Sequence, residues 1–500
     1  MVRDSPDGRR ATGGPPPPVG PGGPDEQRAA PLSDHAPRAA QTIAAIATAR
    51  GTAALAVVRA SGAGAVPVVA SRFSDAGLAE AAGRTAWVGW LRDADDVPVD
   101  QVVCTVWRGP HSSTGEDVVE VTCHGGDAVA QTVLRVLYQA GARPAEPGEF
   151  TQRAFLNGKL DLAQAEAVAD LIAAESRLGH RAAVSALRGT VSEAVDAVRQ
   201  SLVQTAALVE LELDFGEEDV EFADRSQLAA LLADADRQLE DLVGTARLGA
   251  LARDGVTVVL GGRPNAGKST LLNALVGRDR AIVSPVAGTT RDAVEAEADL
   301  AGLRFRFVDT AGLRETADAV EAEGTRRARA AIDTADVLVY VVDAVVGLDG
   351  EERAFLDDLA ARRPALAVVV VENKADLVDG SGAGLEMPGD TAVLRLSAHD
   401  ALADPAALDG LRQSLVAAVR AEGLDAADAG LVAVNERHRR HLDAARRAVG
   451  RAAASVARGD GGDTLALDLR AALHELGLVT GAVTTEDVLD AVFGQFCIGK

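Results

Sequence analysis

The residues best suited to chemistry form a short motif, GRPNAGKS, at residues 262–269. It matches GxxxxGK[ST], follows an apolar run at residues 256–260 that predicts a strand, and precedes a helical run at residues 270–276. Glycines let backbone N–H groups face phosphate oxygens, and the start of a helix favours negative charge. We expect Lys268 to bridge the β- and γ-phosphates of a nucleotide and Ser269 to bind Mg²⁺.

Further polar segments follow in the order that a guanine-nucleotide hydrolase requires. DTAG at residues 309–312 offers an Asp to the metal shell and a Gly N–H to the γ-phosphate. GTTRD at residues 288–292 offers Thr290 to the same metal. NKAD at residues 373–376 ends another predicted strand, and the Asp376 carboxylate accepts from both the ring N–H and the exocyclic amine of guanine. Adenine has no such pair of donors.

These motifs predict a GTP site whose base pocket is completed by backbone amides of the SA pair at residues 397 and 398. We expect Mg²⁺ to be bound by Ser269 and Thr290. The GTP-binding residues expected from the motifs are Asn265, Ala266, Gly267, Lys268, Ser269, Thr270, Thr290, Asp309, Thr310, Ala311, Gly312, Asn373, Lys374, Asp376, Ser397 and Ala398.

The residue that orients the attacking water is not evident from chemistry alone. Leu313 stands where many hydrolases of this kind place a glutamine. The acidic residues that follow are alternatives among which the residue types do not choose, namely Glu315, Asp318, Glu321 and Glu323.

Hydrophobic periodicity divides the chain into an α/β part and an all-α part. Residues 1–38 are rich in Pro and Gly and predict a disordered extension. Residues 39–157 predict a small α/β domain, with strands near residues 54–58, 101–107 and 118–123. Residues 253–422 alternate strands and helices and predict a Ras-like P-loop domain with a mostly parallel sheet. Its strands are expected at residues 256–260, 304–308, 337–342 and 367–371. Residues 158–252 and 423–500 predict one helical domain into which the P-loop domain is inserted, and leucines at helical spacing over residues 228–242 predict the buried stripe of a long helix.

The amino-acid composition indicates in which cellular compartment the protein works and which partners it can bind. The 500 residues carry a net charge of −24, which disfavours a broad nucleic-acid surface, so any RNA contact is expected to be local or shared with a partner. The few lysines, at positions 159, 268, 374 and 500, are expected where a compact positive charge is needed. Three cysteines without CxxC spacing argue against disulfides and structural zinc. With no long apolar segment, the sequence predicts a cytoplasmic protein without a membrane span.

Several longer stretches carry a resemblance to a known family. They are SSTGEDVVEVTCHGG from residue 112, PGEFTQRAFLNGKLDLAQAEAVADLI from residue 147, the P-loop segment through GTTRD, DTAGLRE from residue 309, and the terminal FCIGK. Over residues 41–500 the sequence resembles the bacterial MnmE (TrmE) family of tRNA modification GTPases. The resemblance implies a homodimer that works with the FAD-dependent MnmG subunit, as a heterotetramer, to add an aminomethyl-type group to C5 of the wobble uridine of tRNA. It also implies a folate one-carbon donor.

The resemblance also assigns roles in GTP hydrolysis. It implies that K⁺ serves in place of an arginine finger and pairs the P-loop domains across a dimer. The implied K⁺ ligands are Asn265, Ser284, Val286 and Thr289, of which Ser284 and Thr289 also join the expected GTP site. Among the acidic alternatives, it selects Glu321 as the catalytic residue that orients water, alongside Lys268.

For folate, the resemblance implies binding by Arg59, Glu120, Lys159 and Lys500. Positive side chains suit the carboxylates of a glutamyl tail, and Glu120 suits a pterin N–H edge. An ordinary ion pair is the alternative for Arg59 and Glu120. Cys497, beside Lys500, is either a reactive thiol or a small buried hydrophobe, whereas Cys104 and Cys123 are expected to be structural.

A regulatory GTPase acting in ribosome assembly, without modification chemistry, is the competing hypothesis. The N-terminal domain and the FCIGK tail disfavour it, because an assembly switch needs neither.

Overall fold

A computed structural model describes residues 41–214, 225–277, 296–309, 330–378, 385, 387, 391–420 and 432–500. The expected N-terminal extension lies outside these residues. Among the described helices, none is both long and apolar enough to cross a membrane.

The N-terminal domain is a six-stranded sheet with strand order β3-β4-β5-β2-β1-β6, and the strands expected near residues 54–58, 101–107 and 118–123 are present. Its elements are β1 (Ile43–Ile46), β2 (Leu55–Ser61), α2 (Ala65–Ala70), β3 (Thr85–Arg92), β4 (Pro98–Trp107), β5 (Val118–His124), α3 (Asp127–Gln139) and β6 (Arg143–Pro144). Alternate residues such as Val58 and Val121 are buried in a core that includes α2 and α3 side chains. Arg59 and Glu120 therefore lie on the opposite, open face.

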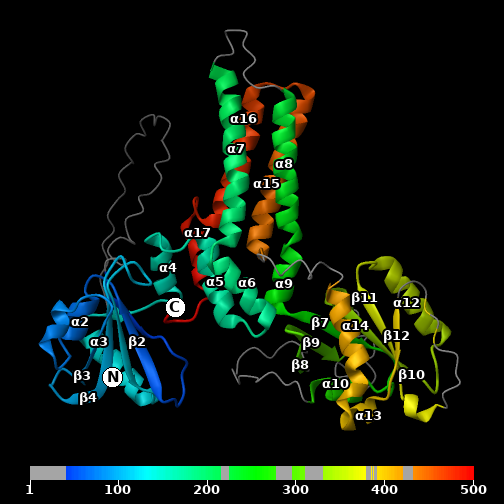
Figure 1. The fold of residues 1–500 in the computed structure, drawn as a ribbon, viewed down its shortest axis with the longest axis horizontal. Coiled ribbons are helices and arrows are strands. Elements are labelled where there is room, and N and C mark those ends of the chain that lie inside the picture. Colours follow the sequence, from blue (N-terminus) through cyan, green and yellow to red (C-terminus); the bar gives the residue numbers. More distant parts are fainter. Residues whose placement is uncertain are drawn as a thin grey trace, which may run out of the picture. The chain divides into compact units, whose positions relative to one another are not determined.

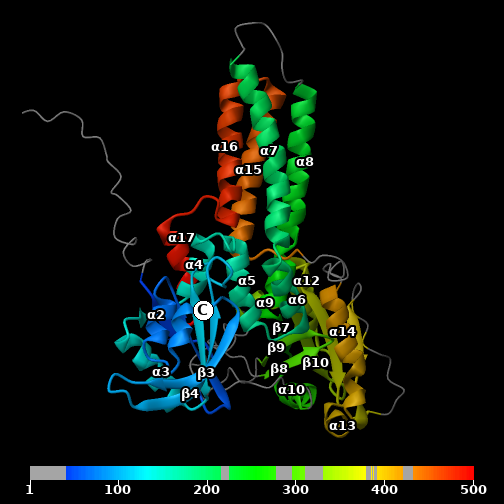
Figure 2. The same ribbon diagram turned by 60° about the vertical axis from the view of Figure 1, so that its left-hand side comes forward.

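The helical domain contains a bundle formed by α7, α8, α15 and α16, which run side by side in both Figure 1 and Figure 2. The leucine stripe predicted at residues 228–242 lies in α8, where Leu228, Leu232 and Leu239 are fully buried. α4 (Glu149–Leu156) precedes this domain, whose helices are α5 (Leu162–Ala173), α6 (Arg177–Leu187), α7 (Thr190–Asp214), α8 (Arg225–Gly244), α9 (Ala246–Asp254), α15 (Glu436–Arg458), α16 (Gly462–Thr480) and α17 (Glu486–Phe493).

The P-loop domain, comprising β7 to α14, is a sheet of order β12-β11-β10-β7-β9-β8 that is parallel except for β8. All four strands predicted for it are present. Its elements are β7 (Val256–Gly261), α10 (Lys268–Val276), β8 (Ala296–Leu300), β9 (Leu303–Asp309), β10 (Val337–Asp343), α12 (Gly350–Arg362), β11 (Ala367–Asn373), β12 (Ala392–Arg395), α13 (Ala398–Ala403) and α14 (Asp409–Arg420).

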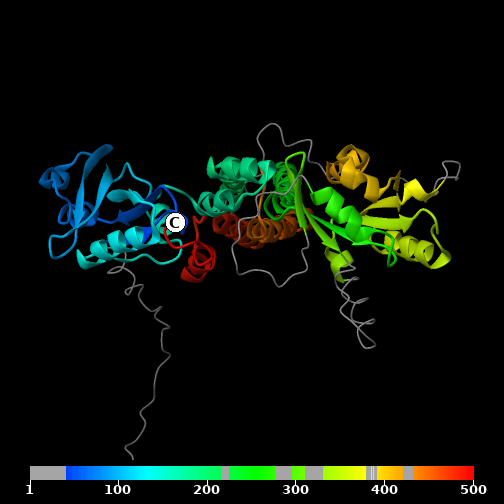
Figure 3. The same cartoon turned by 90° about the horizontal axis from the view of Figure 1, so that it is seen from below.

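Both faces of this sheet are covered, as its near-continuous apolar strands require. Val339 of β10 packs with side chains of α10 and α14, whereas its neighbours Leu338 and Tyr340 pack with α12. Figure 3 shows α12 and α14 on opposite sides of the sheet. This doubly covered sheet places the ends of β7, β9, β10 and β11, with the loops that follow them, along one edge.

The P-loop domain is inserted between α9 and α15, and the chain segments that lead into and out of it touch. An ideal Cβ on Gly249 of α9 would lie 2.2 Å from the carbonyl oxygen of Val434, which is fully buried. Only a glycine permits this approach without a shift of backbone.

We predict that Gly249→Ala lowers the free energy of unfolding by about 1–3 kcal/mol, because the added methyl group overpacks this contact. Thermal unfolding followed by circular dichroism measures the change. Gly244→Ala is the control, since a methyl group added there would have no neighbouring atom within 4 Å, and its effect should stay within about 1 kcal/mol. Equal melting temperatures for the two variants would contradict the assigned contact.

Candidate functional site

The phosphate-binding loop connects the end of β7 to α10, which begins at Lys268, two residues earlier than predicted. Gly262 and Gly267 both have positive φ, at 125° and 96°. A Cβ on Gly267 would lie 2.1 Å from Asn373 Nδ2. The buried Lys268 ammonium donates to the carbonyl oxygens of Gly262 at 2.9 Å and Arg263 at 2.8 Å. The loop therefore holds this ammonium where a phosphate chain would lie.

A hydroxyl and a carboxylate meet beside the loop. Ser269 Oγ donates to Asp309 Oδ2 at 2.8 Å, and Asp309 is 1% exposed at the end of β9. These are the hard oxygen donors that suit Mg²⁺, so the described residues fit the expected metal.

Asn373 joins the phosphate-binding loop to the loop before α13. Its Nδ2 donates to the Ala266 carbonyl oxygen at 2.8 Å, and its Oδ1 accepts from the Ala398 N–H at 2.8 Å. Ser397 caps α13 by accepting from Asp400 N–H. The Ala398 amide expected to face the base thus bonds Asn373 in this structure.

Lys374 and Asp376 follow directly at the end of β11. Lys374 has a positive φ of 65°, and its Nζ donates to Asp343 Oδ2 at 2.6 Å. Asp376 lies in a short 3-10 turn with its carboxylate exposed, as recognition of a base requires. Sequence reasoning missed Asp343, although its position at the end of the neighbouring parallel strand β10 was a usable signal.

Sequence reasoning also missed a contact of the phosphate-binding loop with α12. Arg263 forms ion pairs with Asp349 and with Glu352, the latter at 3.3 Å. Asp349 and Glu352 form the capping box of α12, so one arginine attaches the loop to a helix start. The remaining predicted residues lie outside the described part of the chain: Ser284, Val286, Thr289, Thr290, Thr310, Ala311, Gly312 and Glu321, with the alternatives Glu315, Asp318 and Glu323.

A second cluster, the tail site, comprises Arg59, Glu120, Phe150 and Lys500. Arg59 and Glu120 face each other across β2 and β5, and Arg59 Nη2 lies 2.8 Å from Glu120 Oε1. The Arg59 guanidinium carbon lies 5.7 Å from the centroid of the Phe150 ring. The Phe150 N–H donates to the Lys500 carbonyl oxygen at 3.1 Å, so the C-terminal tail ends beside this pair.

Lys159 is connected to the tail site through a loop rather than by direct contact. Its Nζ donates to the Pro110 carbonyl oxygen at 3.1 Å. Asn157 donates to the Thr114 carbonyl oxygen, and the Thr114 hydroxyl lies 2.8 Å from the hydroxyl of Ser61 on β2. The structure therefore brings Arg59, Glu120 and the main chain of Lys500 together and places Lys159 at the margin.

A buried charge network holds this region together and was not predicted. Arg153, 4% exposed, bonds Glu116 and Glu149 at 2.9 Å each. Burial of the Glu149 carboxylate opposes its ionisation, but hydrogen bonds from Arg143, a backbone amide and Arg153 lower its pKa overall. Each arginine of this network lies beside a glutamate, and this pairing offsets the free-energy cost of burying the charges.

The structure contains two buried cysteines, which the sequence predicted to be structural, and one exposed cysteine. Cys104 and Cys123 are buried, and burial raises their pKa values to about 12 and about 11. Both thiols are therefore unreactive at neutral pH. Cys497 is exposed in the tail, which rules out the buried alternative for it.

We predict that Asn373→Ala weakens GDP binding by at least about tenfold, because two hydrogen bonds that shape the phosphate-binding loop are lost. Displacement of a fluorescent GDP analogue measures the affinity. Asn273→Ala, at an exposed position of α10, is the matched control and should bind normally. Wild-type affinity in the Asn373 variant would show that the bridge is dispensable.

Comparison with known proteins identifies the family. A family model for the GTP-binding protein TrmE N-terminus matches residues 42–159, and a model for the MnmE helical domain matches residues 162–497. The tRNA modification GTPase MnmE of Salinibacter ruber is 55% identical over 92% of this chain and 99% of its own length. That of Cytophaga hutchinsonii is 40% identical, covering 92% and 98%. Among solved structures, the FeoB G-domain from Methanococcus jannaschii is 24% identical over 33% of this chain and 97% of that chain, with a TM-score of 0.24. The chain belongs to the MnmE family of tRNA modification GTPases.

Proposed function

We propose that this GTPase, together with an FAD-dependent MnmG-type subunit, adds an aminomethyl-type group to C5 of the wobble uridine of tRNA, using a folate one-carbon unit, in the cytoplasm. The observation that carries the proposal is the tail site. A C-terminal tail that ends beside a partly exposed Arg59–Glu120 pair forms a second polar site in a chain that already has a nucleotide site.

GTP hydrolysis in this proposal depends on positioning and charge. Lys268 binds the β- and γ-phosphates, Ser269 and Thr290 hold Mg²⁺, and Glu321 orients the attacking water. Bound Mg²⁺ and K⁺ supply positive charge that stabilises the transition state. Asn265 supports a K⁺ role, because it is exposed at the rim of the loop with a φ of 63°. The other proposed K⁺ ligands are Ser284, Val286 and Thr289.

Guanine specificity rests on Asp376 in this proposal. Its exposed carboxylate accepts two hydrogen bonds from the base, while Asn373 and Lys374 fix the loop from which it projects.

We predict that Asp376→Asn weakens GTP binding at least about 100-fold, since the charge and one of the two acceptor oxygens are lost and an amide N–H faces a donor of the base. Xanthine nucleotides should gain affinity, because the new amide donates to the 2-oxo group. Calorimetric titration with both nucleotides gives the two constants. Asp333→Asn, an exposed carboxylate before β10, is the control. Unchanged GTP affinity would remove Asp376 from the base pocket.

Folate binding is proposed for the tail site and Lys159. Arg59 is 21% and Glu120 28% exposed at the side chain, so a ligand can reach both. Phe150 adds an aromatic surface beside them, and Arg59, Lys159 and Lys500 supply positive charge for the glutamyl carboxylates. Glu120 suits the N–H edge of a pterin.

A homodimer is supported by the open face of the N-terminal sheet. Val88 pairs with Val103 in register, and these residues are 68% and 36% exposed. Trp90 and Leu55 lie on the same face and are 45% and 60% exposed. These exposed apolar side chains share the sheet face that carries Arg59 and Glu120, and exposed apolar surface of this kind marks an interaction site. We propose that a second copy covers it.

The proposed function predicts that Lys159→Ala abolishes the modified wobble uridine while GTP hydrolysis persists. Loss of a charge-assisted hydrogen bond should weaken 5-formyltetrahydrofolate binding at least about tenfold. Mass spectrometry of tRNA incubated with both subunits, GTP, a one-carbon folate, an ammonium salt as nitrogen source and a reductant measures product, and calorimetry measures 5-formyltetrahydrofolate binding.

Arg135→Ala, an exposed change on α3, is the control for this experiment. Folded wild-type protein that hydrolyses GTP but binds no folate and yields no modified tRNA would favour a regulatory GTPase of ribosome assembly instead.

A further inference from the structure

The outgoing connector of the P-loop domain, residues 432–435, leads into α15 and is anchored at the first turn of that helix. Asn435 caps α15, and its N–H donates to Nδ1 of His438 in a capping box. Because Nδ1 accepts this hydrogen, the neutral ring carries its proton on Nε2, which donates to Glu166 Oε2 at 2.7 Å. The start of α15 is thereby tied to α5.

Arg437, one residue earlier, joins α15 to two other segments of chain, α5 and the end of α16. Its Nε and Nη2 donate to the two carboxylate oxygens of Glu166 on α5, at 2.7 and 2.8 Å. Its Nη1 donates to the Leu478 carbonyl oxygen at 2.6 Å, and its Nη2 to that of Val479 at 3.0 Å. The carbonyls belong to the last turn of α16. We call Arg437, His438 and Glu166 the Arg437 joint.

The two helices held by this joint lead to two parts of the proposed folate site, Lys159 and the C-terminal tail. The capping residue of α5, Asp161, stands two positions after Lys159. After α16, the chain continues through α17 to the tail that ends at Lys500. Leu162 of α5 packs in one cluster with Phe493 and Phe496, which flank the start of this tail.

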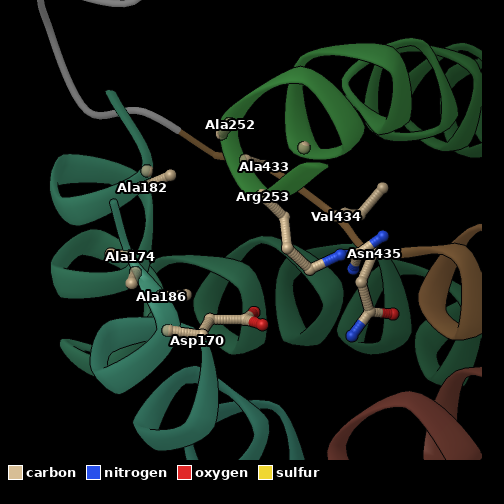
Figure 4. A pocket seen from close by; sticks show the side chains of 13 residues that line it. Asp170, Ala174, Ala182, Ala186, Ala252, Arg253, Ala433, Val434 and Asn435 are labelled. Atoms are coloured by element: carbon tan, nitrogen blue, oxygen red, sulfur yellow. The ribbon is translucent and has the colours of Figure 1, made fainter. Parts of the chain in front are cut away.

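A small pocket lies beside the joint. Its lining is mostly alanine and glycine from α5, α6, α9 and the outgoing connector. Figure 4 shows the Asp170 and Arg253 side chains extending into it, with Asn435 alongside. Burial raises the pKa of Asp170, which fits a carboxylate that is not fully paired in this arrangement.

We propose that Arg437 is a positioning residue that transmits the position of the P-loop domain to Lys159 and the C-terminal tail. The proposal rests on the proposed function, which assigns Lys159 and the C-terminal tail to folate binding. When the outgoing connector moves, the first turn of α15 moves with it. Because the Arg437 guanidinium binds both α5 and the end of α16, these two elements move together with α15. A lysine has a single ammonium and does not hold four acceptors in this geometry.

Cys497 provides a direct readout, because it is the exposed thiol of the tail while Cys104 and Cys123 are buried. We expect its alkylation rate in the full-length protein to differ at least about fivefold between the GDP state and the state with a non-hydrolysable GTP analogue. In Arg437→Lys the two rates should become equal, while the rate of GTP hydrolysis remains close to wild type.

Two further variants make the result decisive. Arg446→Lys is the matched control, because Arg446 lies on the same helix but pairs with Asp236 and Glu240 of the bundle, and it should keep the wild-type difference. Glu166→Gln removes the negative charge that Arg437 binds, and it should also make the two Cys497 alkylation rates equal. This second variant tests the proposal if Arg437→Lys does not fold.

A folded Arg437→Lys protein with the full wild-type difference would overturn the proposal, and so would a wild-type protein whose Cys497 rates are equal in both states. The readout requires no tRNA, partner subunit or folate. Its outcome is therefore separate from that of the modification assay, which tests the proposed function.

Discussion

Insertion of one domain into another imposes the constraint on which the rest of this structure depends: the chain must leave and re-enter the helical domain at nearly the same place. The approach of Gly249 to the Val434 carbonyl meets this constraint, and Val434 is fully buried there. The re-entering chain forms α15 immediately. Asn435 caps this helix, and Arg437 binds it to Glu166 of α5. Helices on both sides of the insertion, α8 and α15 among them, then share one apolar core, so the interrupted sequence still forms a continuous bundle.

In this acidic chain, arginines and lysines occupy different kinds of position, because a guanidinium is planar and an ammonium is compact. Arginines carry the interactions with several acceptors, as Arg437 and Arg153 do, because a planar fork binds two or more oxygens at fixed angles. The four lysines instead belong to the two candidate sites, with Lys268 and Lys374 at the nucleotide site. A compact ammonium suits a phosphate or a carboxylate that arrives with a ligand. We propose that these lysines bind ligands, whereas Arg153 and Arg437 hold the protein together.

The nucleotide site and the tail site are built by different means. The first collects loops at one edge of a parallel sheet, and the buried Asn373 fixes two of those loops to each other. The second joins distant parts of the chain, because β2 and β5 present Arg59 and Glu120 while Phe150 receives the terminal Lys500. Hydrogen bonds join the start of α15 to α5 and to the end of α16, and these are the contacts on which the proposed coupling depends.

The sequence by itself determined the motifs, the four parallel strands and the leucine stripe of α8, because strand and helix periodicities and the GxxxxGKS spacing are local properties of the chain. It also indicated the family through stretches such as FCIGK. Tertiary structure alone decided that Asn373 bridges two loops, that Asp343 pairs with Lys374, and that the buried Arg153 and the partly buried Arg437 each bind several acceptors. These contacts join residues from about 30 to about 270 positions apart, and a charged residue in a helix has the same local pattern whether it faces solvent or a buried carboxylate. The direction in which each side chain points depends on which elements pack beside it, and that is fixed only when the whole chain has folded.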